Sequence, residues 1–175
     1  MDDQQLWDLG SKRLKALHAG FPAETKRSVA ELLARYSQRK EALAAVIAGI
    51  DGSALCHQCG GQCCLNGKYR VNVFDALGFI VQQTLPSADF IQKPVCPYGS
   101  LDGCRMEPEL RPADCILFLC DTLDEKISPH FRMILAAGEE DLRECIKQAS
   151  RLIGEQVHAP FLLWAEKQRY INPNV

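Results

Sequence analysis

The sequence predicts a mostly α-helical fold: a single domain of helices around an irregular, cysteine-rich centre, with room for one short strand or hairpin. Apolar residues recur at three- and four-residue intervals in the first and last thirds of the chain, which is typical of amphipathic helices. Between these parts, cysteine, glycine and proline interrupt every periodic stretch. We therefore divide one compact domain into an N-terminal helical segment (1–54), a cysteine-rich core (55–121) and a C-terminal helical segment (122–175).

Two helices are predicted in the N-terminal segment. The first runs from Leu6 to Leu17 and ends near Gly20, because glycine favours the position just past a helix. Pro22 suits the first turn of the second helix, which is closed by Gly49 or by the Asp-Gly pair after Ile50. The apolar stripe of this second helix is compatible with packing inside the fold and with a dimer seam, and it contains Val29, Leu32, Leu33, Tyr36, Leu43, Val46, Ile47 and Ile50.

Regular structure in the middle of the chain is predicted to be short. Alternation from Tyr69 to Val73 favours a brief strand or extended segment, and Asn72 or Asp75 is a suitable start for a short helix. A further helix is expected from Pro112 to Cys120, burying Cys115. Long elements are excluded before that point by five prolines, Pro86, Pro94, Pro97, Pro108 and Pro112.

Helical periodicity returns in the C-terminal segment. We expect one helix over 131–137 and another from Glu139, with Gly138 separating them. Pro160 is expected to begin or kink a last helix, and residues 172–174 read as a frayed end.

Charge and hydropathy exclude several classes of protein. The chain opens with acidic residues and lacks the basic start and continuous apolar core of a secretory signal, so we expect a soluble, cytoplasmic protein with no membrane association. The 20 basic and 22 acidic residues give a net charge of −2, which provides no general attraction for nucleic acid. A protein is the partner we expect.

Eight of the nine cysteines fall into two groups, which is the strongest functional signal in the sequence. The first group has the spacing C-x-x-C-x-x-x-C-C with glycines after its second cysteine, and such turns let sulfurs converge on a metal. In a reducing compartment, clustered cysteines favour metal ligation over disulfides. The candidate metal ligands are Cys56, Cys59, Cys63 and Cys64 in the first group and Cys96, Cys104, Cys115 and Cys120 in the second.

The ligand count leaves the number of sites open. A structural zinc or an ordinary iron–sulfur cluster takes about four thiolates, so eight cysteines are enough for two sites, or for one site with additional thiols. Because the side chains of Cys63 and Cys64 tend to diverge, we expect the two groups to interleave rather than to hold one metal each.

Over residues 55–121, the chain resembles the cysteine-cluster proteins of the zinc- or iron-chelating domain family. The resemblance rests on the cysteines of the first group with their glycine-bearing turn, and on Cys96, Cys104, Arg111 and Pro112 just before Cys115, with Cys120 closing the segment. The family pattern has two residues before the paired cysteines, whereas this chain has Gly60, Gly61 and Gln62.

The resemblance implies a metal centre, and one branch of the family, the flagellin lysine methylases, implies an iron–sulfur cluster. We therefore expect a cluster, with [4Fe–4S] favoured and Zn²⁺ as the alternative, that serves electron transfer, redox sensing or cluster-dependent chemistry with a partner. The alternatives are a zinc-stapled interaction module and, on weaker grounds, a protein-modifying enzyme related to lysine N-methylases. Arg111 is the candidate to bind carbonyls of the cysteine loops or to offset thiolate charge.

Other residues near the cysteines have simpler interpretations. His57 lies inside a C-x-x-C turn, where intervening residues usually point outward. Cys145 shares a helical face with Leu142 and Ile146, so core packing is favoured over ligation. Tyr69 and Tyr98 are candidates to flank the centre, although shielding of the core is the simpler account. No catalytic residue can be assigned from local spacing.

Overall fold

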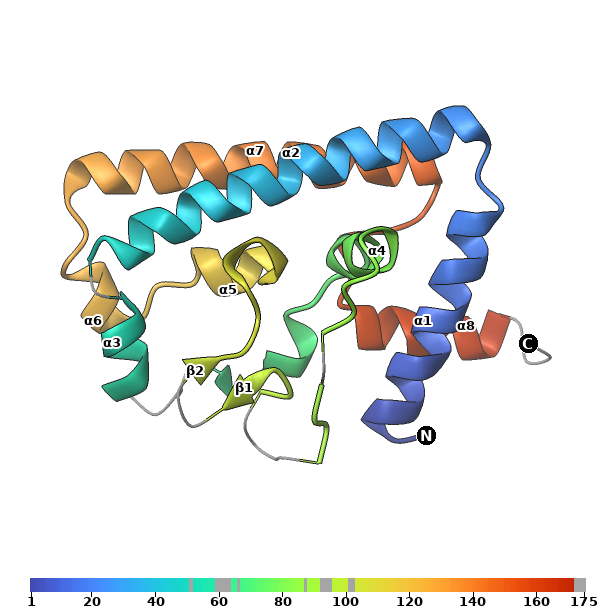
Figure 1. Cartoon of the computed structure of the whole chain (residues 1–175), viewed down its shortest axis with the longest axis horizontal. Helices are drawn as coiled ribbons and strands as arrows, with labels where there is room; N and C mark the ends of the chain where they lie inside the picture. Colours follow the sequence, from blue (N-terminus) through green and yellow to red (C-terminus); the bar gives the residue numbers. More distant parts are fainter. Residues whose placement is uncertain are drawn as a thin grey trace.

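Helices form most of this structure, a computed structural model that describes residues 1–50, 52–58, 64–65, 67–86, 88–91, 96–100 and 103–171. The mostly α-helical class predicted from the sequence is confirmed. Figure 1 shows two long helices, α2 (Ala23–Ala48) and α7 (Pro129–Ile153), running antiparallel along one edge of the molecule. The shorter elements, including the cysteine-bearing ones, lie below this pair in the same view.

The N-terminal helices begin and end close to the predicted positions. Helix α1 (Asp3–Ala19) starts with a capping box, in which the Gln5 amide donates to the Asp2 carboxylate at 2.8 Å and the Asp2 amide donates to the Gln5 side chain at 3.0 Å. The helix ends at Gly20, as expected. Pro22 stands just before α2, where its missing N–H costs no helical hydrogen bond.

The buried stripe of α2 packs inside the fold. Helix α2 contacts α7 along most of its length, and Figure 1 shows the two helices side by side. The apolar stripe of α2 is therefore buried by packing within the chain. This is the first of the two arrangements that the sequence left open, the other being a dimer seam. The fully buried side chains of α2 are Val29, Leu33, Tyr36, Lys40 and Leu43.

The predicted break at Gly138 is wrong, because α7 is one continuous helix. Gly138 is buried in its middle, where a Cβ would come within 2.4 Å of Leu43 Cδ2 and 2.9 Å of Leu43 Cδ1. The glycine is there for close packing against α2 rather than for ending a helix. Ser128 caps the helix by accepting from the Phe131 amide at 3.2 Å, and Gly154 ends it in the left-handed conformation.

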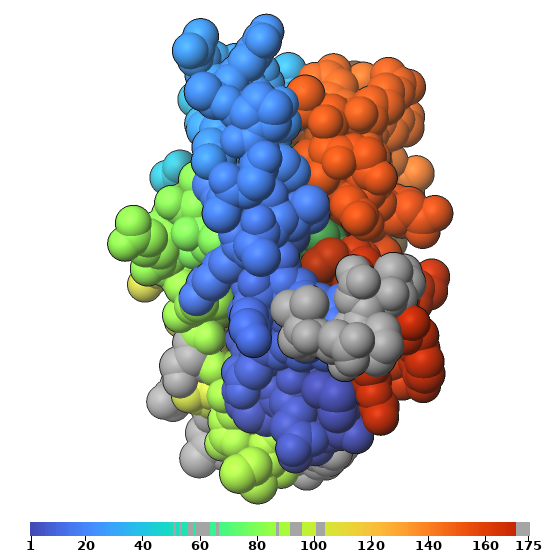
Figure 2. Space-filling view, turned by 90° about the vertical axis from the view of Figure 1, so that its right-hand side faces the viewer, coloured from blue at the N-terminus to red at the C-terminus, as the bar shows by residue number. Residues whose placement is uncertain are grey.

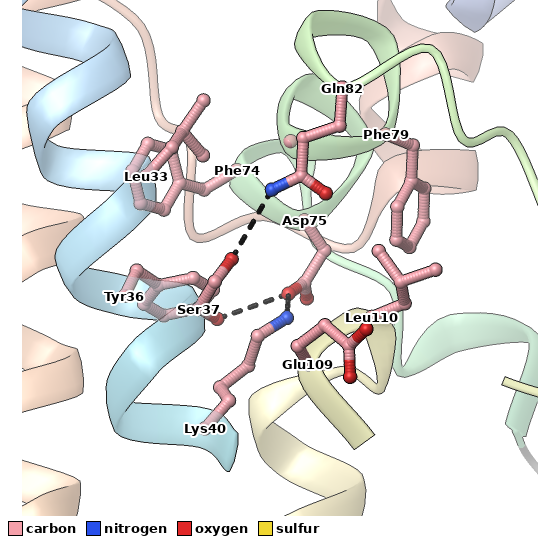
Figure 3. A pocket seen from close by; sticks show the side chains of 11 residues that line it. Leu33, Tyr36, Ser37, Lys40, Phe74, Asp75, Phe79, Gln82, Glu109 and Leu110 are labelled. Carbon is pink, nitrogen blue, oxygen red and sulfur yellow. Dashed lines mark hydrogen bonds and ion pairs between the residues drawn. The ribbon is translucent and has the colours of Figure 1, made fainter. Parts of the chain in front are cut away.

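Helix α4 (Val73–Val81) is tied to α2 by a buried ion pair (Figure 3). Its N-cap is Asn72, whose side chain accepts from the Asp75 amide at 2.8 Å. One oxygen of the Asp75 carboxylate accepts from Lys40 Nζ at 3.1 Å and from the Tyr36 hydroxyl at 3.2 Å. Burial raises the pKa of Asp75, and the Lys40 ammonium opposes that rise. The pair fixes α4 beneath the long helices.

The sequence predicted a brief strand or an extended segment from Tyr69 to Val73; a strand over this range is wrong, and the backbone is extended at Asn72. The 3₁₀ helix η2 (Gly67–Tyr69) occupies the start of this range and α4 begins at its end. Between them, Asn72 forms an isolated bridge with Pro160, and the Phe161 amide donates to the Val71 carbonyl at 2.8 Å. These bonds attach the centre of the chain to α8 (Phe161–Ile171), which begins just after Pro160 as predicted.

Helix α8 packs against α1 at the other end of the molecule. Trp7 of α1 meets Phe161 edge to face, with ring centroids 4.9 Å apart. Figure 2 shows the surface of α1 beside that of α8, with the end of α7 above them. The two ends of the chain therefore close one side of the fold. The expected frayed tail at 172–174 lies outside the described residues.

The cysteine-rich segment consists of short elements. A helix expected over Pro112–Cys120 is shorter than predicted and ends at Leu117, and the expectation that it buries Cys115 is wrong, because Cys115 is exposed. The one antiparallel hairpin among the described residues pairs Gly99 with Cys104 and Ser100 with Gly103. The elements of this segment, besides η2 and α4, are α3 (Gly52–Gln58), β1 (Gly99–Ser100), β2 (Gly103–Cys104), η3 (Pro108–Leu110), α5 (Ala113–Leu117) and α6 (Asp121–Asp124).

Buried residues from all three sequence segments belong to one apolar cluster. It joins Trp7 and Leu43 with Tyr98 and Met106 of the middle segment and with Leu142 of α7. In the part of the chain that the structure describes, no helix has the length and apolar character needed to span a bilayer.

Replacing Lys40 with methionine is expected to lower the free energy of unfolding by about 3–5 kcal/mol at neutral pH, because it leaves the Asp75 carboxylate buried without its cation. The loss should shrink as the pH falls, since the folded state then gains a proton on a carboxyl whose pKa is already raised. Urea unfolding at several pH values measures both effects. Arg39→Met, which removes an exposed charge from the same helix, is the control; an equal loss in both variants would contradict the assignment.

Replacing Gly138 with alanine is expected to lower the free energy of unfolding by about 1–3 kcal/mol, despite the higher helix propensity of alanine, because the new methyl group overlaps Leu43. Gly78→Ala is the matched control. A Cβ at Gly78, in α4, would lie 3.4 Å from Leu33 Cδ2 as its nearest neighbour, so this change should be close to neutral. Thermal unfolding of both variants tests the difference, and a stabilising Gly138→Ala change would refute it.

Candidate metal centre

The structure describes five of the eight predicted ligand cysteines with their side chains. Cys96 is buried, Cys64 and Cys120 are half-buried, and Cys104 and Cys115 retain exposed surface. For Cys56, the structure places the backbone in α3, and nothing is described of its side chain. Cys59 and Cys63 lie outside the described residues.

Packing brings the segments of the two cysteine groups together. Helix α3, which carries Cys56, contacts strand β2, which ends at Cys104. The same helix contacts α6, which begins directly after its N-cap residue Cys120. Figure 1 shows α3, α6 and β2 close together at one end of the molecule. Elements that carry or adjoin cysteines of the first and second groups therefore pack against one another, as an interleaved arrangement requires.

A second contact between the two halves of the segment is formed by Gly67 and Cys96. A Cβ at Gly67 would come within 2.4 Å of the Cys96 Sγ and 2.6 Å of its Cβ. Only glycine therefore fits in this position of η2. The Cys96 carbonyl accepts from the Gly99 amide at 2.9 Å, which closes a turn leading into the hairpin that carries Cys104.

Three cysteines of the second group are close enough to influence one another electrostatically. Cys115 keeps exposed surface, but the protein packed around its sulfur and the negative charge on Cys96 and Cys104 both raise the pKa of its thiol. The Arg70 guanidinium has the opposite effect. Without a cation, Cys115 is therefore held as a neutral thiol at neutral pH, and a bound metal ion would reverse that preference.

The candidate ligands are cysteine thiols, and their chemistry suits a metal that binds thiolates. Segments that carry or adjoin cysteines from distant parts of the chain pack together, and sulfur is the ligand type that zinc and iron–sulfur clusters share. Among the described residues, no three cysteine, histidine, aspartate or glutamate side chains form a complete metal-binding group.

Arginine side chains hold the loops around these cysteines. Arg111 Nε donates to the Met106 carbonyl at 3.0 Å, which is one of the two contacts considered for it from the sequence. Arg105 Nη2 donates to the Pro97 carbonyl at 2.9 Å, and Arg70 Nη1 lies 3.5 Å from the Asp114 carbonyl. Sequence reasoning missed Arg70 and Arg105. Their placement beside η2 and directly after Cys104 is the signal that could have found them.

The structure also places most of the residues for which the sequence favoured a role other than metal ligation. Cys145 is buried in α7, as predicted for a core residue, and its sulfur accepts from Arg35 Nε at 3.2 Å. Tyr69 is exposed, whereas Tyr98 is buried against Trp7, with ring centroids 5.8 Å apart. Tyr98 therefore shields the core. Nothing is described of the His57 side chain.

Replacing Gly67 with alanine is expected to lower the free energy of unfolding of the protein as purified by about 1–3 kcal/mol, because Cys96 or η2 has to move. Thermal unfolding measures the change. Gly20→Ala is the control, since a Cβ there would meet only backbone oxygens at 3.5 Å or more. If Gly67→Ala unfolds like the wild-type protein, the close contact with Cys96 is not maintained in solution.

Comparison with known proteins adds no assignment for this centre. No protein-family model matches the chain, and neither a curated protein nor a solved structure matches it. The resemblance of the cysteine pattern to the zinc- or iron-chelating domain family therefore stays a prediction, and the case for the site depends on its own residues.

Proposed function

We propose that this chain is a metalloprotein of the zinc- or iron-chelating cysteine-cluster type, whose thiolates hold an iron–sulfur cluster used with a protein partner. The observation that carries the proposal is the packing of α3 against β2 and α6. This packing brings the segments of Cys56, Cys104 and Cys120 together from opposite ends of the cysteine-rich core. The antiparallel pairing of α2 with α7 places α3 next to α6, and the additional contact of α3 with β2 adds the segment of Cys104.

The ligands of the centre would come from both cysteine groups. When bound, the cluster would supply reversible electron transfer or redox sensing. Arg111 would keep the loop after Cys104 in place through its bond to the Met106 carbonyl. The proposed ligands are drawn from Cys56, Cys59, Cys63, Cys64, Cys96, Cys104, Cys115 and Cys120.

The surroundings of the cysteines support a redox role. Cys96 is buried and belongs to the same apolar core cluster as Trp7, Phe90 and Tyr98. Cys104 is exposed at the end of β2. A centre between Cys96 and Cys104 would have an apolar inner side and an outer side open to a partner. A reducing compartment such as the cytoplasm would keep the thiols reduced and available as ligands.

A structural zinc site is the second candidate. The observation in its favour is the shortness of the elements near the cysteines: α5 has 5 residues, α6 has 4 and each hairpin strand has 2. Such elements are not stable alone, and bound zinc contributes directly to folding. In this case the helical surface, rather than the metal, would contact the partner.

Analysis of iron, zinc and acid-labile sulfide in protein purified without oxygen is expected to give near-stoichiometric iron and sulfide and a brown colour that bleaches on reduction. Zinc without sulfide or colour would overturn the cluster in favour of the structural site. Protein that carries neither metal after anaerobic reconstitution would refute both candidates.

Cys104→Ser and Cys115→Ser are each expected to lose most of the bound metal, because each removes a thiolate ligand. Cys145→Ala is the control: this cysteine is buried in α7, its sulfur accepts a hydrogen bond from Arg35 on α2, and the metal content of the variant should equal that of the wild-type protein. Metal analysis together with circular dichroism separates loss of metal from loss of fold. Wild-type metal content in both serine variants would contradict their assignment as ligands.

A further inference from the structure

The buried side chain of Tyr98 carries a hydroxyl group that is not paired within the described part of the chain. The residue is only 2% exposed, and its Oη has no hydrogen-bond partner there. Trp7 and Phe90 hold the ring in place, with centroids 5.8 and 6.4 Å from that of Tyr98. Because buried hydroxyls in folded proteins are normally paired, this one points to an acceptor that these residues do not yet provide.

Backbone hydrogen bonds place Tyr98 between two of the candidate ligands. Tyr98 follows Cys96 by two residues, in the turn that the Gly99 amide closes by donating to the Cys96 carbonyl at 2.9 Å. The Tyr98 carbonyl accepts from the Arg105 amide at 2.9 Å, and Arg105 comes directly after Cys104. The backbone of Tyr98 is therefore fixed to the segments that carry both cysteines.

The charges that act on the Tyr98 hydroxyl come from the candidate centre and from α4. Burial raises the pKa of Tyr98, and negative charge on Cys96, Asp75 and Cys115 raises it further. The Asp75 carboxylate already accepts three hydrogen bonds from other groups, which leaves the sulfurs of the two cysteines. A neutral thiol is a weak acceptor, whereas a thiolate bound to a metal keeps negative charge and accepts strongly.

We propose that the Tyr98 hydroxyl donates a hydrogen bond to the metal-bound thiolate of Cys96 or of Cys115, and that this bond tunes the reduction potential of the centre. The inference rests on the proposed function, since it requires a metal bound by these thiolates. A hydrogen bond to sulfur stabilises negative charge there, and reduction of an iron–sulfur cluster adds negative charge. The bond therefore favours the reduced form and raises the potential. Tyr98 is a positioning residue in this account, not a ligand.

Redox titration of the full chain, purified without oxygen, compares Tyr98→Phe with the wild-type protein. The variant should be about tenfold harder to reduce, which lowers the potential by about 59 mV for one electron. Its fold should be kept, because the ring stays and the lost hydroxyl has no partner among the described residues. Tyr69→Phe, which changes an exposed tyrosine, should titrate like the wild-type protein. An unchanged potential in Tyr98→Phe would overturn the proposal.

Metal content of the wild-type protein separates this proposal from the proposed cluster. If the protein carries zinc without sulfide, the cluster is refuted, but Tyr98 can still be tested by competition with a chelator. Tyr98→Phe should then bind zinc about tenfold more weakly than the wild-type protein, because the thiolate has lost a donor. Equal zinc affinity would overturn the role of Tyr98 alone. Protein that takes up neither metal would overturn both proposals.

Discussion

The buried ion pair between Lys40 and Asp75 is the contact on which the arrangement of the other elements depends. Both side chains are almost completely removed from water, and a charge in such a place is tolerated only with a partner and further hydrogen bonds. Asp75 has these bonds, because Tyr36 and the amide of Asn72 also donate to its carboxylate. The pair therefore permits one position of α4 relative to α2.

This constraint extends from the long helices to both sides of the fold. On one side, the amides of Val73 and Phe74 at the start of α4 donate to the carbonyls of Ala159 and Val157, which places α8. On the other side, η3 packs against α2 and α4, and Leu110 lines the small cavity beside Asp75 in Figure 3. Because η3 follows Arg105 and precedes α5, the second cysteine group takes its position from the same contacts.

Local signals in the sequence predicted the helices and their caps, but not the contacts that depend on distant residues. The end of α1 at Gly20 and the start of α8 after Pro160 follow from residue type, whereas Gly138 does not end a helix because the approach of Leu43 from another helix decides its role. Lys40 falls in the apolar stripe of α2, four residues after Tyr36, and this was the available sign that it is buried with a partner. The candidate centre itself stays a prediction from the cysteine spacing, and the arginine bonds to loop carbonyls have no local pattern.

The antiparallel pairing of α2 and α7 has a consequence for the order of folding. Residues 49–128, which include the entire cysteine-rich core (55–121), lie between these helices in the sequence, so their association closes a long loop. Loop closure costs conformational entropy that rises with the logarithm of loop length, by about 0.6 kcal/mol for each doubling. Any cross-link that forms early inside the segment shortens this effective loop. Assembly of the centre before the helices pair would therefore favour their association, and the two long helices would then close over a segment that is already ordered.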